Sequence, residues 1–288
     1  FSPPPQPYVH PRILISPSDI PGIRKRIKET ESGRINHAAL HDALKNVRKH
    51  SDYQKLSSGN IAGLSLKDIQ LWVLNGLAAE ALICMLDEDE VRGNEMADAV
   101  ESFARLIQQD IEQLKSESDW SKVFPIIRAD TLGLAYDFGY EFFSNTQKTL
   151  IRRLISDLTK NKTYPGLDHL PVIPASTNGW FITQAHLMTL AVAIEGEDGF
   201  NEDTYRQHVE ALRRWVFVAS STNGTTYEGL PRTAFSLNWL VPLAKRGVHL
   251  FASPNVKNHI RKYHLHAMLP WGIGKFVFQG GINYSRDI

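Results

Sequence analysis

The sequence is poor in cysteine and has no long apolar run. Cys84 is the only cysteine among 288 residues, so the chain cannot form an internal disulfide. The stretch Leu187 to Ile194 is far shorter than the ~18 apolar residues of a membrane-spanning helix. With 42% hydrophobic and 22% charged residues, the composition excludes a disordered or collagen-like chain. We therefore expect a soluble globular protein without a membrane span, in which Cys84 is a small buried hydrophobe.

The chain also lacks a strong overall charge, because its net charge is +1. Residues 87–119 carry eleven acidic and three basic side chains, a net of −8. Residues 201–288 carry eleven basic and five acidic side chains, a net of +6, together with five histidines. Nucleic-acid-binding domains are usually far more basic, which argues against such a partner. A polyanionic ligand would be attracted to the C-terminal third, although ordinary solvated helix faces explain most single charges.

The first residues lack an initiator methionine. The chain begins with Phe1, Ser2 and a run of three prolines. Such a start is typical of a chain from which a signal peptide or a tag has been removed. We expect a secreted or periplasmic protein.

Strand signals are scarce, and apolar residues return every three or four positions almost throughout. We expect an all-α fold, with Ser18 as the N-cap of a first helix that ends near Thr30. Further helices are predicted near 34–50, 66–86, 90–115, 123–143, 146–160, 179–195, 202–221, 230–245 and 255–268.

The alternation of short and long connections suits helical hairpins, arranged either in a ring or in a layered bundle. An extended N-terminal segment is predicted for 1–12, lying on the surface, followed by a helical domain over 13–272. Residues 273–288 read as the start of a β-rich segment.

One predicted helix begins with a cluster of polar and aromatic residues. Tyr227, Glu228 and Arg232 lie just before an apolar run, and helix N-termini favour anions. Arg232 opposes the helix dipole there, so an anionic ligand or Glu228 would offset its cost; a plain Glu228–Arg232 ion pair is the structural alternative. Trp239 lies on roughly the same face and is a candidate for stacking on a sugar ring, or for the core.

A second helix start carries a similar set of residues. Asn178 and Trp180 follow a long proline-containing loop, and Gln184 and His186 lie one to two turns later. They are candidates for contact with a substrate; the alternative is an N-cap, a core tryptophan and a partly buried histidine. Arg128 precedes another helix and could line the same rim.

His259, His264 and His266 match no strong metal-binding pattern and read as surface histidines. We therefore expect no metal site.

Five stretches, taken together and in order, resemble a known family. They are His10 to Leu14, Leu132 to Phe138, Asn178 to Trp180, Glu195 to Asp198 and Tyr227 to Gly229. Their succession is similar to the N-terminal toroid of heparinase II/III-like and alginate-lyase-like polysaccharide lyases. The resemblance implies an incomplete (α/α) toroid whose groove binds an anionic, uronic-acid-containing polysaccharide, commonly followed by β-sandwich domains.

The resemblance implies cleavage by β-elimination, without a required cofactor. Such an enzyme neutralises the uronate carboxylate, removes the C5 proton and returns a proton to the leaving oxygen. Of the family's polar residues only Asn178 matches directly, and Arg232 stands where relatives tend to have a tyrosine. We predict that Asn178 and Arg232 hold the carboxylate and that Tyr227 or His186 moves protons. Trp180, Gln184, Glu228, Trp239 and Arg128 are predicted to contact the substrate.

Two other functions fit the same residues. The chain could be a carbohydrate-binding toroid without catalysis, because the family's usual histidine and tyrosine are absent. It could also be a glycoside hydrolase on a similar helical ring, using two carboxylates from among Asp137, Asp168 and Glu228. The sequence leaves the oligomeric state open.

Overall fold

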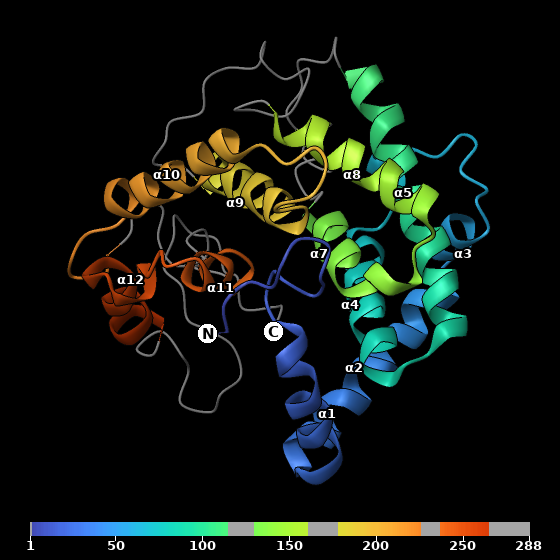
Figure 1. Cartoon of the computed structure of the whole chain (residues 1–288), viewed down its shortest axis with the longest axis horizontal. Helices are drawn as coiled ribbons and strands as arrows, with labels where there is room; N and C mark the ends of the chain where they lie inside the picture. Colours follow the sequence, from blue (N-terminus) through green and yellow to red (C-terminus); the bar gives the residue numbers. More distant parts are fainter. Residues whose placement is uncertain (1, 115–129, 161–177, 226–236, 265–288) are drawn as a thin grey trace, which may run out of the picture.

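The computed structural model describes residues 2–114, 130–160, 178–225 and 237–264 (Figure 1). This part of the chain is helical and contains no β-strand. The all-α prediction is therefore confirmed for it. The predicted β-rich segment 273–288 lies outside the described residues.

The helix boundaries agree closely with the apolar periodicity. The helices are α1 (Ile20–Glu29), α2 (Glu31–Lys49), α3 (Ser51–Ser57), α4 (Leu71–Asp87), α5 (Glu90–Leu114), α7 (Asp130–Gly139), α8 (Asn145–Thr159), α9 (Asn178–Ala193), α10 (Glu202–Ala219), α11 (Leu237–Lys245) and α12 (Pro254–Asn258), followed by a π-helical turn (His259–His264).

Three local details differ from the prediction. The helix predicted near 66–86 begins only at Leu71, after a separate 3-10 turn over Leu66–Asp68. The short helix α3 was not predicted. The first helix is preceded by a turn with Ser16, and not Ser18, at its N-cap, where the Ser16 N–H donates to Asp19 Oδ2 at 2.8 Å.

Four central helices run in the same direction. The Thr131 hydroxyl at the start of α7 lies 3.4 Å from Asn75 Oδ1 near the start of α4, and Asp130 pairs with His186, halfway along α9. One turn further on, Gly133 lies close against Leu190, where a Cβ atom on Gly133 would come within 3.3 Å of the leucine side chain. The C-terminal ends also meet, because Arg246 after α11 binds Glu195 after α9. Thus α4, α7, α9 and α11 are parallel neighbours.

The longer helices between them run the opposite way. α5 starts beside the C-terminal end of α7, where Gly93 packs on Phe142, and reaches back to Leu66, whose N–H donates to Asp110. α10 likewise starts beside the end of α9 and continues until Trp215 packs against Trp239 of α11. The chain therefore alternates between central helices and antiparallel covering helices (Figure 1).

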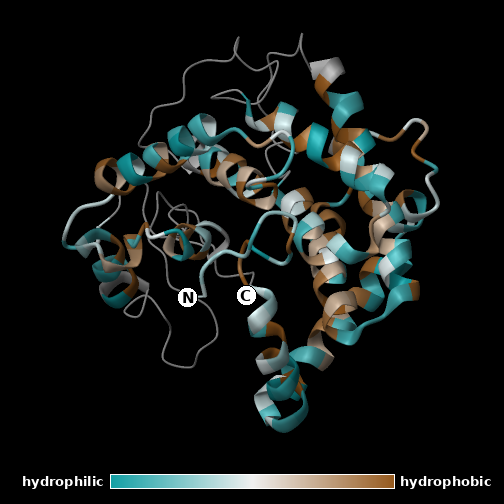
Figure 2. Ribbon diagram, viewed as in Figure 1, coloured by the Kyte–Doolittle hydropathy of each residue, from teal (hydrophilic) through white to brown (hydrophobic). Residues whose placement is uncertain are grey.

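Burial explains this division. From Thr131 to Gly139 every side chain of α7 is buried, and from Leu187 to Ala193 so is that part of α9. A helix that is apolar all round belongs in the interior. In α10 the buried residues instead return every three or four positions, and Figure 2 shows hydrophobic and hydrophilic residues alternating along it. Cys84 of α4 is fully buried, as predicted, and burial raises the pKa of its thiol to about 12.

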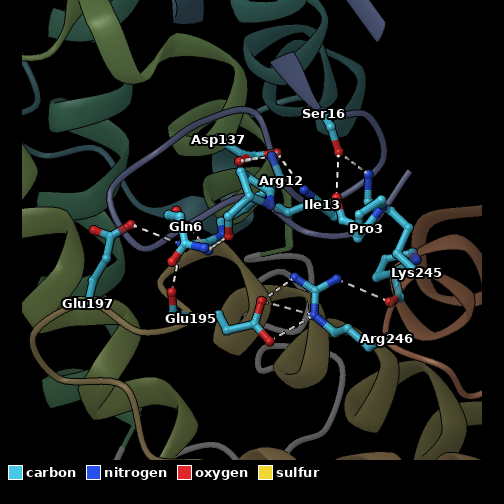
Figure 3. Close-up of polar contacts among 12 residues, drawn as sticks. Pro3, Gln6, Arg12, Ile13, Ser16, Asp137, Glu195, Glu197, Lys245 and Arg246 are labelled. Carbon is cyan, nitrogen blue, oxygen red and sulfur yellow. Dashed lines mark hydrogen bonds and ion pairs between the residues drawn. The ribbon is translucent and has the colours of Figure 1, made fainter. Parts of the chain in front are cut away.

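The N-terminal segment does not simply lie on the surface, as its composition predicted. Arg12 and Ile13 are 1% and 0% exposed, and both backbone N–H groups donate to the Asp137 carboxylate of α7 at 2.8–3.0 Å (Figure 3). The Arg12 guanidinium donates to the Glu195 carbonyl at 2.6 Å. Residues 10–13 are buried because they supply hydrogen-bond donors that the helices themselves do not provide. These donors bind Asp137 and a carbonyl group beyond the end of α9.

Candidate functional site

His186 and Asp130 form the candidate site, where the first residue of α7 faces the middle of α9. The His186 Nε2 atom lies 3.5 Å from Asp130 Oδ2, and the two side chains are 17% and 13% exposed. Asp130 is the first residue of α7, where a carboxylate is stabilised by the positive end of the helix dipole. His186 lies about two turns into α9, which runs parallel to α7. A partly exposed imidazole beside a carboxylate is a suitable acid–base group, because the carboxylate stabilises the protonated ring.

The parallel helices have their dipoles aligned in one direction. α4, α7, α9 and α11 all direct their N-terminal ends the same way, and each helix dipole is equivalent to roughly half a positive charge there. Their first N–H groups have no partner within the helix. At the opposite end, Arg12, Lys245 and Arg246 gather near the C-terminal ends (Figure 3). The cations thus complement the negative ends of these helices.

The other predicted site residues fall into three groups. Asn178 is the first residue of α9 and Trp180 lies in its first turn, as predicted, although the structure does not describe their side chains. The residues predicted from the remaining junctions lie outside the described residues: Arg128, Tyr227, Glu228 and Arg232.

Gln184 and Trp239 lie in the core. Gln184 is 6% exposed, and its Oε1 atom accepts a hydrogen bond from His208 Nδ1 of α10 at 2.8 Å. Trp239 is 1% exposed and packs edge-to-face on Trp215, with ring centroids 6.3 Å apart. For Trp239 this is the core position considered above as the alternative to sugar stacking. In this structure both side chains join α9 and α11 to the covering helix α10 and are not placed to contact a ligand.

Protonation of His208 makes the stability of this core depend on pH. Burial lowers its pKa to about 4, against an ordinary value of 6.5. The unfolded chain therefore binds more protons than the folded chain between these values, so stability is lost as the pH falls from 6.5 towards 4. We expect His208 to account for a loss of about 2 kcal/mol in the free energy of unfolding between pH 7.5 and 5.0.

Urea unfolding of the wild type and of a His208→Asn variant at both pH values tests this expectation. Asparagine keeps an N–H donor for Gln184 but does not titrate. The loss in the free energy of unfolding between the two pH values should be smaller in the variant by about 2 kcal/mol. An equal pH dependence in the two proteins would contradict the assignment to His208.

A second polar cluster lies at the C-terminal ends of α7 and α9, and the sequence did not reveal it. His10 lies between two carboxylates: its Nδ1 is 2.7 Å from Asp137 Oδ1 and its Nε2 is 2.7 Å from Glu197 Oε1. The Tyr136 hydroxyl donates to Glu197 Oε2 at 3.0 Å, and the His10 ring stacks on Tyr140 with centroids 4.1 Å apart. Burial lowers the pKa of His10, but the hydrogen bonds and charges of Asp137 and Glu197 outweigh it, so the pKa is raised.

This cluster joins the N-terminal segment to the C-terminal ends of α7 and α9. The side chains of His10, Asp137 and Glu197 are 1%, 0% and 0% exposed. Asp137 was considered as one of two hydrolase carboxylates; the structure corrects that possibility, because His10 and two backbone N–H groups occupy its oxygens. In the sequence, the sign of this cluster was an acidic residue, Asp137, inside the apolar run 132–138. Its partners could not be predicted from local patterns because they are more than 120 residues away.

The predictions about histidines and metals need one correction. His259 is fully buried, with Nδ1 3.0 Å from the Gly224 carbonyl, and is not a surface residue. The side chain of His264 and the whole of His266 are outside the described set. Elsewhere, His37, His41 and Asp87 place three potential ligand atoms within 4.8 Å of one another, so the described residues do include a group that could hold a metal ion.

Comparison with known proteins gives no family assignment. No protein-family model matches the chain, and no curated protein matches it. Among the described residues, no helix has both the length and the apolar character needed to cross a membrane.

Proposed function

We propose that this chain is the helical portion of a polysaccharide lyase that cleaves a uronic-acid-containing anionic polysaccharide by β-elimination. The observation that carries the proposal is the His186–Asp130 pair, which joins the first residue of α7 to the middle of α9. Asn178, which matches the family pattern, is the first residue of the same helix α9. The proposal thus combines a sequence resemblance with an acid–base pair found independently in three dimensions.

The order of the helices supports a toroidal arrangement. Central helices α4, α7, α9 and α11 are parallel, and antiparallel helices such as α5 and α10 cover them. Successive helical hairpins arranged around a ring produce this alternation. We therefore propose an (α/α) toroid of which the described helices form the larger part.

In the proposed reaction, His186 removes the C5 proton of the uronate and the C4–O bond breaks. Asp130 stabilises the imidazolium that forms. Asn178 and Arg232 are proposed to hold the substrate carboxylate, so that negative charge developing next to it is stabilised. Tyr227 is proposed to return a proton to the leaving oxygen. The shared positive ends of the helix dipoles favour an anionic substrate over a neutral one.

Product spectroscopy tests the proposal. The purified chain is incubated with alginate, chondroitin sulfate, heparan sulfate and ulvan, and the ultraviolet absorbance of the C4–C5 double bond is followed. We expect a rise with at least one polymer. New reducing ends without this absorbance would instead indicate hydrolysis. Binding in affinity electrophoresis without cleavage would indicate a carbohydrate-binding toroid. Either of these results, or no binding and no product on any uronate polymer, would overturn the lyase proposal for this chain.

A further inference from the structure

Two histidines of α2 and the last residue of α4 converge at the surface. His37 Nε2 lies 2.7 Å from Asp87 Oδ1, and His41 Nε2 lies 2.8 Å from Asp87 Oδ2. The two imidazole rings are 4.6 Å apart. We propose that His37, His41 and Asp87 form a binding site for a divalent transition metal ion, with Zn²⁺ the ion that suits these ligands best.

Helical spacing brings the two rings together. Residues four apart lie on the same face of a helix, one turn above the other. α2 runs from Glu31 to Lys49 and contains both histidines well inside its ends. Their positions are therefore fixed by a continuous helix, and both rings direct the same atom, Nε2, to one carboxylate. The third ligand comes from a different helix, so the ion would join α2 to α4.

The ligand set has the chemistry of a zinc site. Imidazole nitrogen and carboxylate oxygen bind Zn²⁺ at about 2.0–2.2 Å, whereas Ca²⁺ and Mg²⁺ prefer oxygen ligands alone. The three ligand atoms already lie within 4.8 Å of one another, so small side-chain rotations are enough to surround an ion. The side chains are 23%, 27% and 26% exposed, which gives an ion access and leaves a coordination position for water.

Binding would replace the protons that the histidines share with Asp87. A metal needs the lone pair of Nε2, so a neutral ring moves its proton to Nδ1 and a protonated ring releases one proton to solvent. Asp87 then exchanges its hydrogen bond with His37 and its ion pair with His41 for a metal bond.

The local electrostatics favour a cation at this place. Asp87 is the last residue of α4, and the C-terminal end of a helix carries partial negative charge. Arg24 also reaches this helix end, but it donates to the carbonyl groups of Met85 and Leu86 and pairs with Glu88. Both oxygens of Asp87 are thereby left to the two histidines.

Zinc titration of untagged, chelator-treated protein tests the site. Isothermal titration calorimetry should show one Zn²⁺ bound per chain through these residues, and thermal unfolding should shift upward with added zinc because the unfolded chain does not present the site. His37→Gln, His41→Gln and Asp87→Asn should each weaken binding by about 10- to 100-fold, since even outer-shell partners of a metal contribute this much. Circular dichroism of each variant verifies that the helices remain intact.

His50 provides the matched control. It is also a partly exposed histidine beside a carboxylate, with Nδ1 3.4 Å from Asp52 Oδ2, but among the described residues no second histidine joins it on that carboxylate. His50→Gln should bind zinc like the wild type. The proposal is overturned if the wild type binds no stoichiometric zinc, if the three ligand variants bind it as tightly as the wild type, or if His50→Gln weakens binding as much as His37→Gln does.

Discussion

Replacing His10 with alanine is expected to lower the free energy of unfolding by about 3–5 kcal/mol, the usual cost of removing one partner from a buried ion pair. The imidazole lies between Asp137 and Glu197, and all three side chains are essentially inaccessible to water. Without it, two buried carboxylates would face each other across a cavity. Glu197 would keep Tyr136 and the more distant guanidinium groups of Arg12 and Arg152, and these only partly offset the loss.

Urea unfolding at neutral pH measures this effect, with His50→Ala as the control. His50 is 29% exposed, and its Nδ1 accepts from the Asp52 N–H and caps α3; losing such a cap costs about 0.5–2 kcal/mol, less than the loss expected for His10→Ala. A loss for His10→Ala no larger than for His50→Ala would show that the cluster does not fix the N-terminal segment.

The pH dependence of His10 has the opposite sign to that of His208. The pKa of His10 is raised in the folded state, so its stabilising contribution is fully present below the ordinary value of 6.5 and is lost as the pH rises through the folded-state value. The stability difference between the wild type and His10→Ala should therefore shrink on the alkaline side. His208 instead reduces stability on the acidic side. Together, the two histidines make the protein most stable at pH values above the range in which His208 is protonated and below the folded-state pKa of His10.

Local patterns in the sequence predicted most of the helices because periodic burial is a local property. The ends of α5, α8 and α10 were predicted to within a few residues on this basis. α3 was missed because it has only seven residues, of which Tyr53 and Leu56 alone are buried. So short an element carries too little periodicity to separate from a loop.

The contacts between distant parts of the chain could not be predicted in this way. Asp130 was not identified as the partner of His186, because their pairing depends on α7 and α9 running parallel. The proline-rich composition of the first residues predicted an extended surface segment and gave no sign that Asp137 would bind Arg12 from 125 positions away. Asn178 and His186 were predicted as candidates from their position at a helix start, which is a local feature. Which side chains face each other is set by the packing of whole helices.

His186→Gln is expected to reduce the turnover of a uronate polymer by about 10²- to 10⁴-fold, the usual contribution of a positioned general base. Glutamine has a similar size and can still form a hydrogen bond with Asp130, but it cannot accept a proton at neutral pH. Asp130→Asn should reduce turnover less, since the base remains and only the charge that stabilises its protonated form is lost. Both changes should act mainly on kcat, because neither residue is proposed to hold the substrate carboxylate.

The control for this prediction is His249→Gln. His249 is exposed and lies a few residues beyond the C-terminal end of α11, at the end of the molecule opposite His186. Its replacement should leave turnover unchanged. Rates of double-bond formation, measured alongside the free energy of unfolding, separate a chemical role from a structural one. If His186→Gln keeps the wild-type rate on a polymer that the wild type cleaves, His186 is not the base, and Tyr227 becomes the residue to replace next. If its rate falls only in proportion to a loss of folded protein, the His186–Asp130 pair serves to join α9 to α7.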